Sequence, residues 1–144
     1  MSPSSGTRRV IGLDPGQKRI GVALGTNGVA SPLEVIQRSR SLDDDLRRVV
    51  ALIDEWEAEC VVVGLPLTLR GEHGPAARGA TTMAERLARL TAVPVEMHDE
   101  RLTTVTAERT MSEAGLDGVQ RRRHVDKVAA AVMLQSWLDS RSGA

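Results

Sequence analysis

Three acidic residues stand where regular elements of the predicted structure begin or end. They are Asp14 in GLDPG, Glu100 in HDERLTT and Asp126 in RRHVDKVAAA. Carboxylates that a fold gathers at one edge of a sheet are a usual holder for Mg²⁺ or Mn²⁺, and such ions can activate a water against a phosphodiester and stabilise the leaving oxygen. The three acids therefore predict a metal-dependent phosphodiesterase.

Asp14 ends an apolar run that starts at Val10, and strand alternation places it on the same face as Val10 and Gly12. Glycines at 12, 16 and 21 remove side chains from around its carboxylate, so a metal ion or a phosphate could approach closely. The alternative is an Asp-Pro-Gly turn, in which Asp14 only bonds its own backbone. The sequence of this segment favours neither by itself.

Glu100 follows a predicted strand and precedes a predicted helix, at the edge where α/β sheets place ligands. Its neighbour Asp99 is a rival, because a shift of one residue in strand register exchanges which side chain faces the site. A solvated acid beside Arg101 is the other alternative. We favour Glu100 as the second ligand and leave Asp99 open.

Asp126 is predicted in the first turn of a largely apolar helix, on a face that it shares with Ala130 and Trp137. A carboxylate there needs a partner, and a metal ion would supply one. The simpler interpretation is an acid that stabilises the helix dipole and pairs with Lys127 or Arg123.

Basic and glycine-rich segments are candidates for phosphate binding. The run from Arg121 to His124 is the strongest positive patch and stands next to Asp126. The loop from Pro66 to Gly74 leads to a predicted helix N-terminus, whose free N–H groups attract anions, although an ordinary flexible loop fits the same residues. The predicted nucleic-acid contacts are Arg19, Arg70, Arg122, Arg123 and Lys127, and the predicted phosphate loop uses Gly64, Pro66, Gly71 and Gly74.

Composition narrows the class of protein. The 144 residues fit a single domain, and equal numbers of basic and acidic residues, 19 each, argue against a binder held by overall charge. With no Phe, no Tyr and two Trp, the chain lacks the aromatic platforms of single-strand binding modules. One cysteine, no apolar run of membrane-spanning length and no signal-peptide pattern predict a cytoplasmic protein without membrane association.

Hydrophobic periodicity and turn residues predict the elements that must position these side chains. Strands at 10–14, 20–24 and 29–37 form an antiparallel meander, and buried strands follow at 60–65 and 93–98. Helices are expected at 42–56, after a capping box of Ser41 and Asp44, and at 75–90, 104–114 and 124–139. The face predicted to be buried in the second helix holds Ala76, Ala80, Met83, Ala84, Leu87 and Leu90.

This order predicts an α/β fold with a mixed five-stranded sheet, three antiparallel strands plus two parallel ones, and helices on both faces. The domain is expected to span residues 9–139, between a flexible segment at 1–8 and a flexible tail at 140–144.

The chain resembles the YqgF family, also called RuvX, of Holliday junction resolvases and pre-16S rRNA nucleases. Four segments carry the resemblance in order and spacing: RVIGLDPGQKRIGVAL, VVVGLPLTLRGEHGPAA, VPVEMHDERLTTVTAE and HVDKVAAAVMLQSWL. It covers Arg9 to Leu138 and implies a ribonuclease H-like fold, with Asp14, Glu100 and Asp126 as a metal-binding catalytic triad. Thr68 and Arg70 depart from the family pattern in the loop.

The resemblance implies a cytoplasmic role in maturing the 5′ end of the 16S rRNA precursor, with cleavage of branched DNA as the alternative. Two further hypotheses are a catalytically silent nucleic-acid-binding module and an ATPase of the actin and sugar-kinase type. The ATPase is disfavoured, because one such lobe leaves no second wall for a nucleotide. The residues leave open RNA or DNA as substrate, and monomer or homodimer as assembly.

Overall fold

The computed structural model describes residues 8–66, 70–99 and 118–142, and within the last segment the side chains of 126–141. The elements in chain order are β1 (Arg9–Pro15), β2 (Arg19–Thr26), β3 (Val29–Gln37), α1 (Leu42–Glu55), β4 (Cys60–Leu65), α2 (Pro75–Leu90), β5 (Val95–Asp99) and α4 (Gly118–Ser142). The predicted helix at 104–114 lies outside the described residues.

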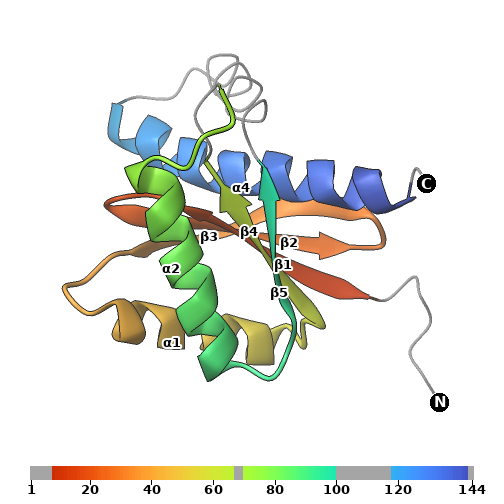
Figure 1. Ribbon diagram of the computed structural model, residues 1–144. Coiled ribbons are helices and arrows are strands. Elements are labelled where there is room, and N and C mark those ends of the chain that lie inside the picture. Colours follow the sequence, from red (N-terminus) through yellow and green to blue (C-terminus); the bar gives the residue numbers. More distant parts are fainter. Residues whose placement is uncertain (1–7, 67–69, 100–117, 143–144) are drawn as a thin grey trace.

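The strands form a five-stranded sheet in the order β3-β2-β1-β4-β5. β1 is antiparallel to β2 and β2 to β3, whereas β4 runs parallel to both β1 and β5. The predicted meander and the two parallel strands are thus confirmed. Because β1, β4 and β5 are parallel, their C-terminal ends lie at the same edge of the sheet (Figure 1).

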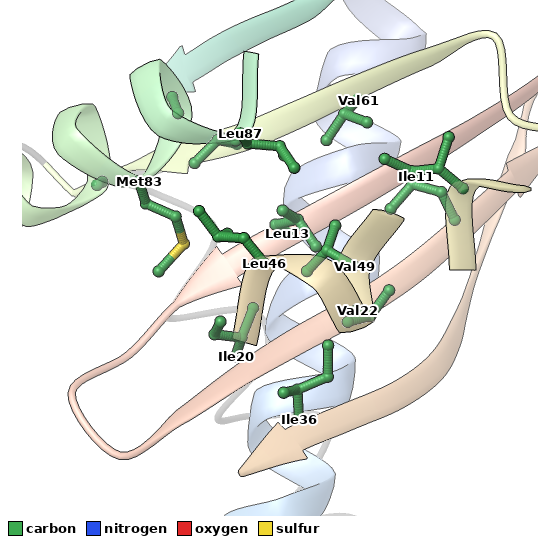
Figure 2. Close-up of a cluster of buried hydrophobic side chains, with 14 of the residues drawn as sticks. Ile11, Leu13, Ile20, Val22, Ile36, Leu46, Val49, Val61, Met83 and Leu87 are labelled. Carbon is green, nitrogen blue, oxygen red and sulfur yellow. The ribbon is translucent and has the colours of Figure 1, made fainter. Parts of the chain in front are cut away.

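Helices cover the sheet on both sides, with α1 and α2 on one face and α4 on the other (Figure 1). The larger core lies under α1 and α2, where β1 contributes Ile11 and Leu13 and the helices contribute Leu46, Met83 and Leu87 (Figure 2). A second core lies under α4 and contains Val10, Ala23, Cys60, Val62, Ala130, Met133, Leu134 and Trp137. Successive side chains of each central strand therefore point alternately into the two cores.

Helix α1 begins as predicted, since the hydroxyl of Ser41 accepts a hydrogen bond from the backbone N–H of Asp44 at 3.2 Å. In α2 the buried stripe is Ala77, Ala80, Met83, Ala84 and Leu87, so the prediction is wrong at both ends, where Ala76 and Leu90 are exposed. Both Ala76 and Ala77 fit the spacing of three and four residues before Ala80, so the spacing alone could not choose between them, and Leu90 is the last residue of the helix.

Strand β5 starts two residues later than predicted, after Pro94, which has no N–H to give to the sheet. Helix α4 starts six residues earlier than predicted, at Gly118. The periodic apolar pattern begins only near Val125, but the basic residues before it are good helix formers and continue the helix toward its N-terminus. The prediction that Asp126 lies in the first helical turn is therefore wrong, and it lies in the helix interior.

No helix in the described part of the chain is both long enough and apolar enough to cross a membrane.

Candidate functional site

Asp14 lies at the C-terminal end of β1, at the edge of the sheet that β4 and β5 share. Two residues before it, Gly12 lies against Leu134 of α4, and Val10 also packs in the core under α4. Strand alternation therefore places Asp14 on the α4 face, as predicted, with its side chain half-buried.

Gly21 brings helix α4 to this position. It is the β2 partner of Asp14 in the antiparallel ladder, so both residues belong to the same face. A Cβ atom added at Gly21 would lie 1.9 Å from the backbone oxygen of Asp126, a distance that no real side chain tolerates. Helix α4 thus packs directly on the backbone of β2. Its residue Asp126 lies over Gly21, which is the β2 partner of Asp14.

Arg19 completes this group. It lies two residues before Gly21 on β2, on the same face, and its Nε donates to Oδ2 of Asp126 at 2.5 Å. Each side chain of the pair is 21% exposed. The sequence proposed Lys127 or Arg123 for this role, whereas the described partner of Asp126 comes from the other end of the chain.

Glu100 lies outside the described residues, but its rival Asp99 does not. Asp99 pairs in register with Leu65 and alternates with Met97, and both of these pack against the core under α1 and α2. Between them, His98 faces α4, where its ring is hydrogen-bonded to Ser136 at 3.0 Å. Asp99 therefore projects on the face opposite to the Asp126 carboxylate, which argues against Asp99 as a ligand.

Two of the three predicted carboxylates, Asp14 and Asp126, are thus brought to one face of one sheet edge. Within the described residues, no group of three His, Cys, Asp or Glu side chains is arranged to hold a metal ion. The oxygen donors nevertheless suit a hard divalent cation, and the Arg19 guanidinium already places positive charge on Asp126. Two carboxylates could therefore supply part of the ligand set of a hard divalent cation, which would need a further ligand and would have to compete with Arg19 for Asp126.

The predicted phosphate-binding residues are more scattered. Gly74 is the N-cap of α2 and provides no side-chain cap, Gly71 has a φ of +82°, and Arg70 is exposed between β4 and α2. Gly64 is buried near the end of β4, and Pro66 lines a cavity beside α2. Arg122 and Arg123 lie on α4, with side chains outside the described set, and Lys127 is half-buried.

Comparison with known proteins decides the family. A family model described as "RuvX: Holliday junction resolvase" matches residues 8–140. The chain belongs to the RuvX family. RuvX, also called YqgF, is a family of nucleases, so the predicted enzyme class and the resemblance to this family are confirmed.

Several relatives of this RuvX chain carry the name "Putative pre-16S rRNA nuclease". A protein of Mycobacterium sp. (strain KMS) is 51% identical, over 96% of this chain and 84% of its own length. One from Anaeromyxobacter sp. is 48% identical, over 92% of this chain and 98% of its own length.

Solved structures show the same fold. The RuvC protein of T. thermophilus, in complex with a Holliday junction substrate, is similar with a TM-score of 0.58 at 22% identity, over 94% of this chain and 96% of that one. The yeast mitochondrial Holliday junction resolvase has a TM-score of 0.50 at 10% identity, over 98% and 83%. The predicted ribonuclease H-like fold is confirmed, and nucleases with this fold typically use divalent metal ions.

Proposed function

We propose that this chain is a divalent-metal-dependent endonuclease that matures the 5′ end of the 16S rRNA precursor. The observation that carries the proposal is the convergence of Asp14 and Asp126 over Gly21, at the edge where parallel strands end. The name shared by relatives about half identical over most of the chain supports the choice of substrate.

We assign the metal ligands to Asp14, Asp126 and Glu100, with Mg²⁺ or Mn²⁺ as the ion. Glu100 is assigned from the sequence, since Asp99 belongs to the opposite face. Bound ions would supply an activated water and stabilise the leaving oxygen of the scissile phosphodiester. Asp14 on β1 and Asp126 on α4 would orient that centre, and Gly21 on the neighbouring strand β2 allows the helix to lie at this position.

Positive side chains would hold the nucleic-acid backbone near these carboxylates. Arg19 is already at the site, and Lys127 lies one residue from Asp126. Arg70, Arg122 and Arg123 would extend the contact through phosphates, which positions a strand without reading its bases. The glycines of the loop before α2 would let a phosphate approach its N-terminal N–H groups.

Cleavage of branched DNA is the second candidate, because the description of the matching family model names a Holliday junction resolvase. Such an enzyme cuts two strands related by symmetry and so acts as a homodimer, whereas an RNA-processing nuclease can act as a monomer.

Cleavage assays with the full chain and Mn²⁺ test the proposal. We expect cutting of a precursor 16S RNA at its 5′ leader, slower or no cutting of a DNA four-way junction, and no ATP hydrolysis. Preferential cutting of the junction would favour the second candidate, and nucleic-acid binding without any cutting would indicate a silent binding module.

The site assignment is tested by Asp14→Asn, which removes a charged ligand and keeps the side-chain shape. We expect it to abolish metal-dependent cleavage and to leave thermal unfolding nearly unchanged. Asp54→Asn, at an exposed position of α1, is the matched control and should cleave like the wild type. Full activity in Asp14→Asn would refute the assignment.

A further inference from the structure

A cavity of about 290 Å³, at the lower end of the range for small-ligand pockets, opens at the edge of the sheet where β1 and β4 end, on the face that α2 covers. Its walls come from four separate segments: Pro15 at the end of β1 with the turn after it, Arg38 after β3, Pro66 after β4, and α2 with Ala76, Gly79 and Met83. Pro15 follows Asp14 directly, and strand alternation together with the α2 walls places the cavity on the face of the sheet opposite to the Asp14 side chain, so the end of β1 separates the two.

Gly79 lines this cavity, and packing against its described neighbours does not explain why a glycine stands there. It lies in the middle of α2, where a glycine destabilises a helix relative to alanine. A Cβ atom added there would meet none of the described atoms within 4 Å, so no contact in the described part of the chain requires the glycine. Its missing side chain instead enlarges the cavity and exposes the helix backbone to a ligand.

A second, basic cavity of about 530 Å³ adjoins the first one, because Gln17 and Arg38 line both. Lys18 and Arg19 also line it, so three basic residues line this open depression. Arg19 is the ion-pair partner of Asp126. The basic cavity therefore connects the proposed catalytic face with the apolar cavity.

Arg38 stands between the two cavities and is held in place by the protein. Its Nη1 donates to the backbone oxygen of Gly16 at 2.9 Å, and its own backbone N–H donates to Lys18 at 2.9 Å. It is the one charged side chain among the described residues that line the apolar cavity. A guanidinium plane fixed in this way can stack on a nucleobase, which suits a chain without Phe or Tyr.

We propose that the two cavities form a subsite for one unpaired nucleotide of the substrate strand. The base enters the apolar cavity between Pro66, Gly79 and Arg38, and its phosphate lies in the basic cavity. A base that stays paired and stacked in a duplex cannot enter such a cavity, so the enzyme selects strands with an unpaired nucleotide next to the cut. This inference rests on the proposed nuclease function.

The test measures binding in a metal-free buffer, where no cleavage takes place. The probe is a short single-stranded RNA that spans the 5′ cleavage position, compared with copies that carry an abasic site at one position at a time. For the wild type, we expect one abasic position to weaken binding about tenfold, from the lost stacking of a single base, and the other positions to have little effect.

The variant Gly79→Leu extends into the apolar cavity from a position where an added Cβ meets no described protein atom within 4 Å. It should bind the intact RNA about tenfold more weakly than the wild type, and the critical abasic site should then cause no further loss. The RNA affinity of Gly79→Ala should lie between that of the wild type and that of Gly79→Leu. Both variants should melt at the same temperature as the wild type or higher, because both replace a helix-interior glycine.

Ala88→Leu adds a side chain of the same size at an exposed position of α2 outside the cavity, and should bind like the wild type. Equal losses for intact and abasic RNA in Gly79→Leu, or no loss at all, would overturn the proposal. Because binding is measured without metal, this result is independent of whether the chain cleaves RNA, DNA or neither.

Discussion

The Nε atom of Arg19 lies 2.5 Å from Oδ2 of Asp126, which joins two residues 107 positions apart in the chain. This ion pair connects the start of β2 with the interior of α4, on the face of the sheet that also carries Asp14. A cation therefore already neutralises one of the proposed metal ligands, and a divalent ion must compete with Arg19 for that carboxylate.

Thermal melts with and without Mn²⁺ test this competition. Asp126→Asn should lose most of the metal-induced rise in melting temperature, while its metal-free stability falls by only about 0–1 kcal/mol from the lost, partly exposed pair. Arg19→Gln should reach the same rise at a lower Mn²⁺ concentration, because the competing charge is gone. A wild-type metal response in Asp126→Asn would remove Asp126 from the site.

Gly21→Ala tests the contact that brings α4 to β1. Its Cβ would overlap the backbone of Asp126, so the helix must move, and we expect a destabilisation of about 1–3 kcal/mol or more in urea unfolding. The metal response should weaken as well. In the matched control, Gly79→Ala in α2, the added Cβ meets no described atom within 4 Å, and this variant should gain up to about 1 kcal/mol. An unchanged free energy of unfolding in Gly21→Ala would contradict the close packing of α4 on β2.

Ionisation of Cys60 should make the free energy of unfolding depend on pH in the alkaline range, and this effect is unrelated to the proposed site. Burial of the thiol raises its pKa from 9.0 to about 11, and the charge of Glu96 and the hydrogen bond that the thiol donates to the Glu96 carboxylate act in the same direction. The folded state therefore holds the thiol proton more tightly than the unfolded chain does. The resulting stability is complete below about pH 9 and is lost as the pH rises toward 11.

Urea unfolding across this pH range checks the expectation. The wild type should lose more stability between about pH 9 and 11 than Cys60→Ala, which has no thiol to ionise. At neutral pH the native thiol should react slowly with a disulfide reagent, since it is buried and protonated. Rapid labelling of the native protein would contradict this assignment.

Arg122→Ala combined with Arg123→Ala tests the basic segment of α4. The double variant should bind nucleic acid more weakly, and the slope of log affinity against log salt should fall by about 0.9 for each lost duplex phosphate contact. The matched control is Arg47→Ala with Arg48→Ala, two exposed arginines of α1 on the other side of the sheet. Equal slopes in wild type and test variant would mean that this segment is only a solvated surface.

Local patterns were enough to predict most of the fold. Alternation and apolar runs predicted β3 and β4 with their observed bounds, and the Ser41 cap predicted the start of α1. Such signals are visible because burial on one or both faces acts on consecutive residues. They failed for the start of α4, where basic residues continue the helix without an apolar pattern to mark it.

The sequence alone also determined which carboxylates to suspect, because Asp14 and Asp126 stand out by their type and apolar surroundings. Only the tertiary structure decided that Asp126 pairs with Arg19, that Asp99 belongs to the opposite face, and that Gly21 sets the approach of α4. The same holds for the cavity beside Gly79, whose walls come from four segments. Contacts between residues tens of positions apart follow from strand order and register, and no local pattern encodes either of these.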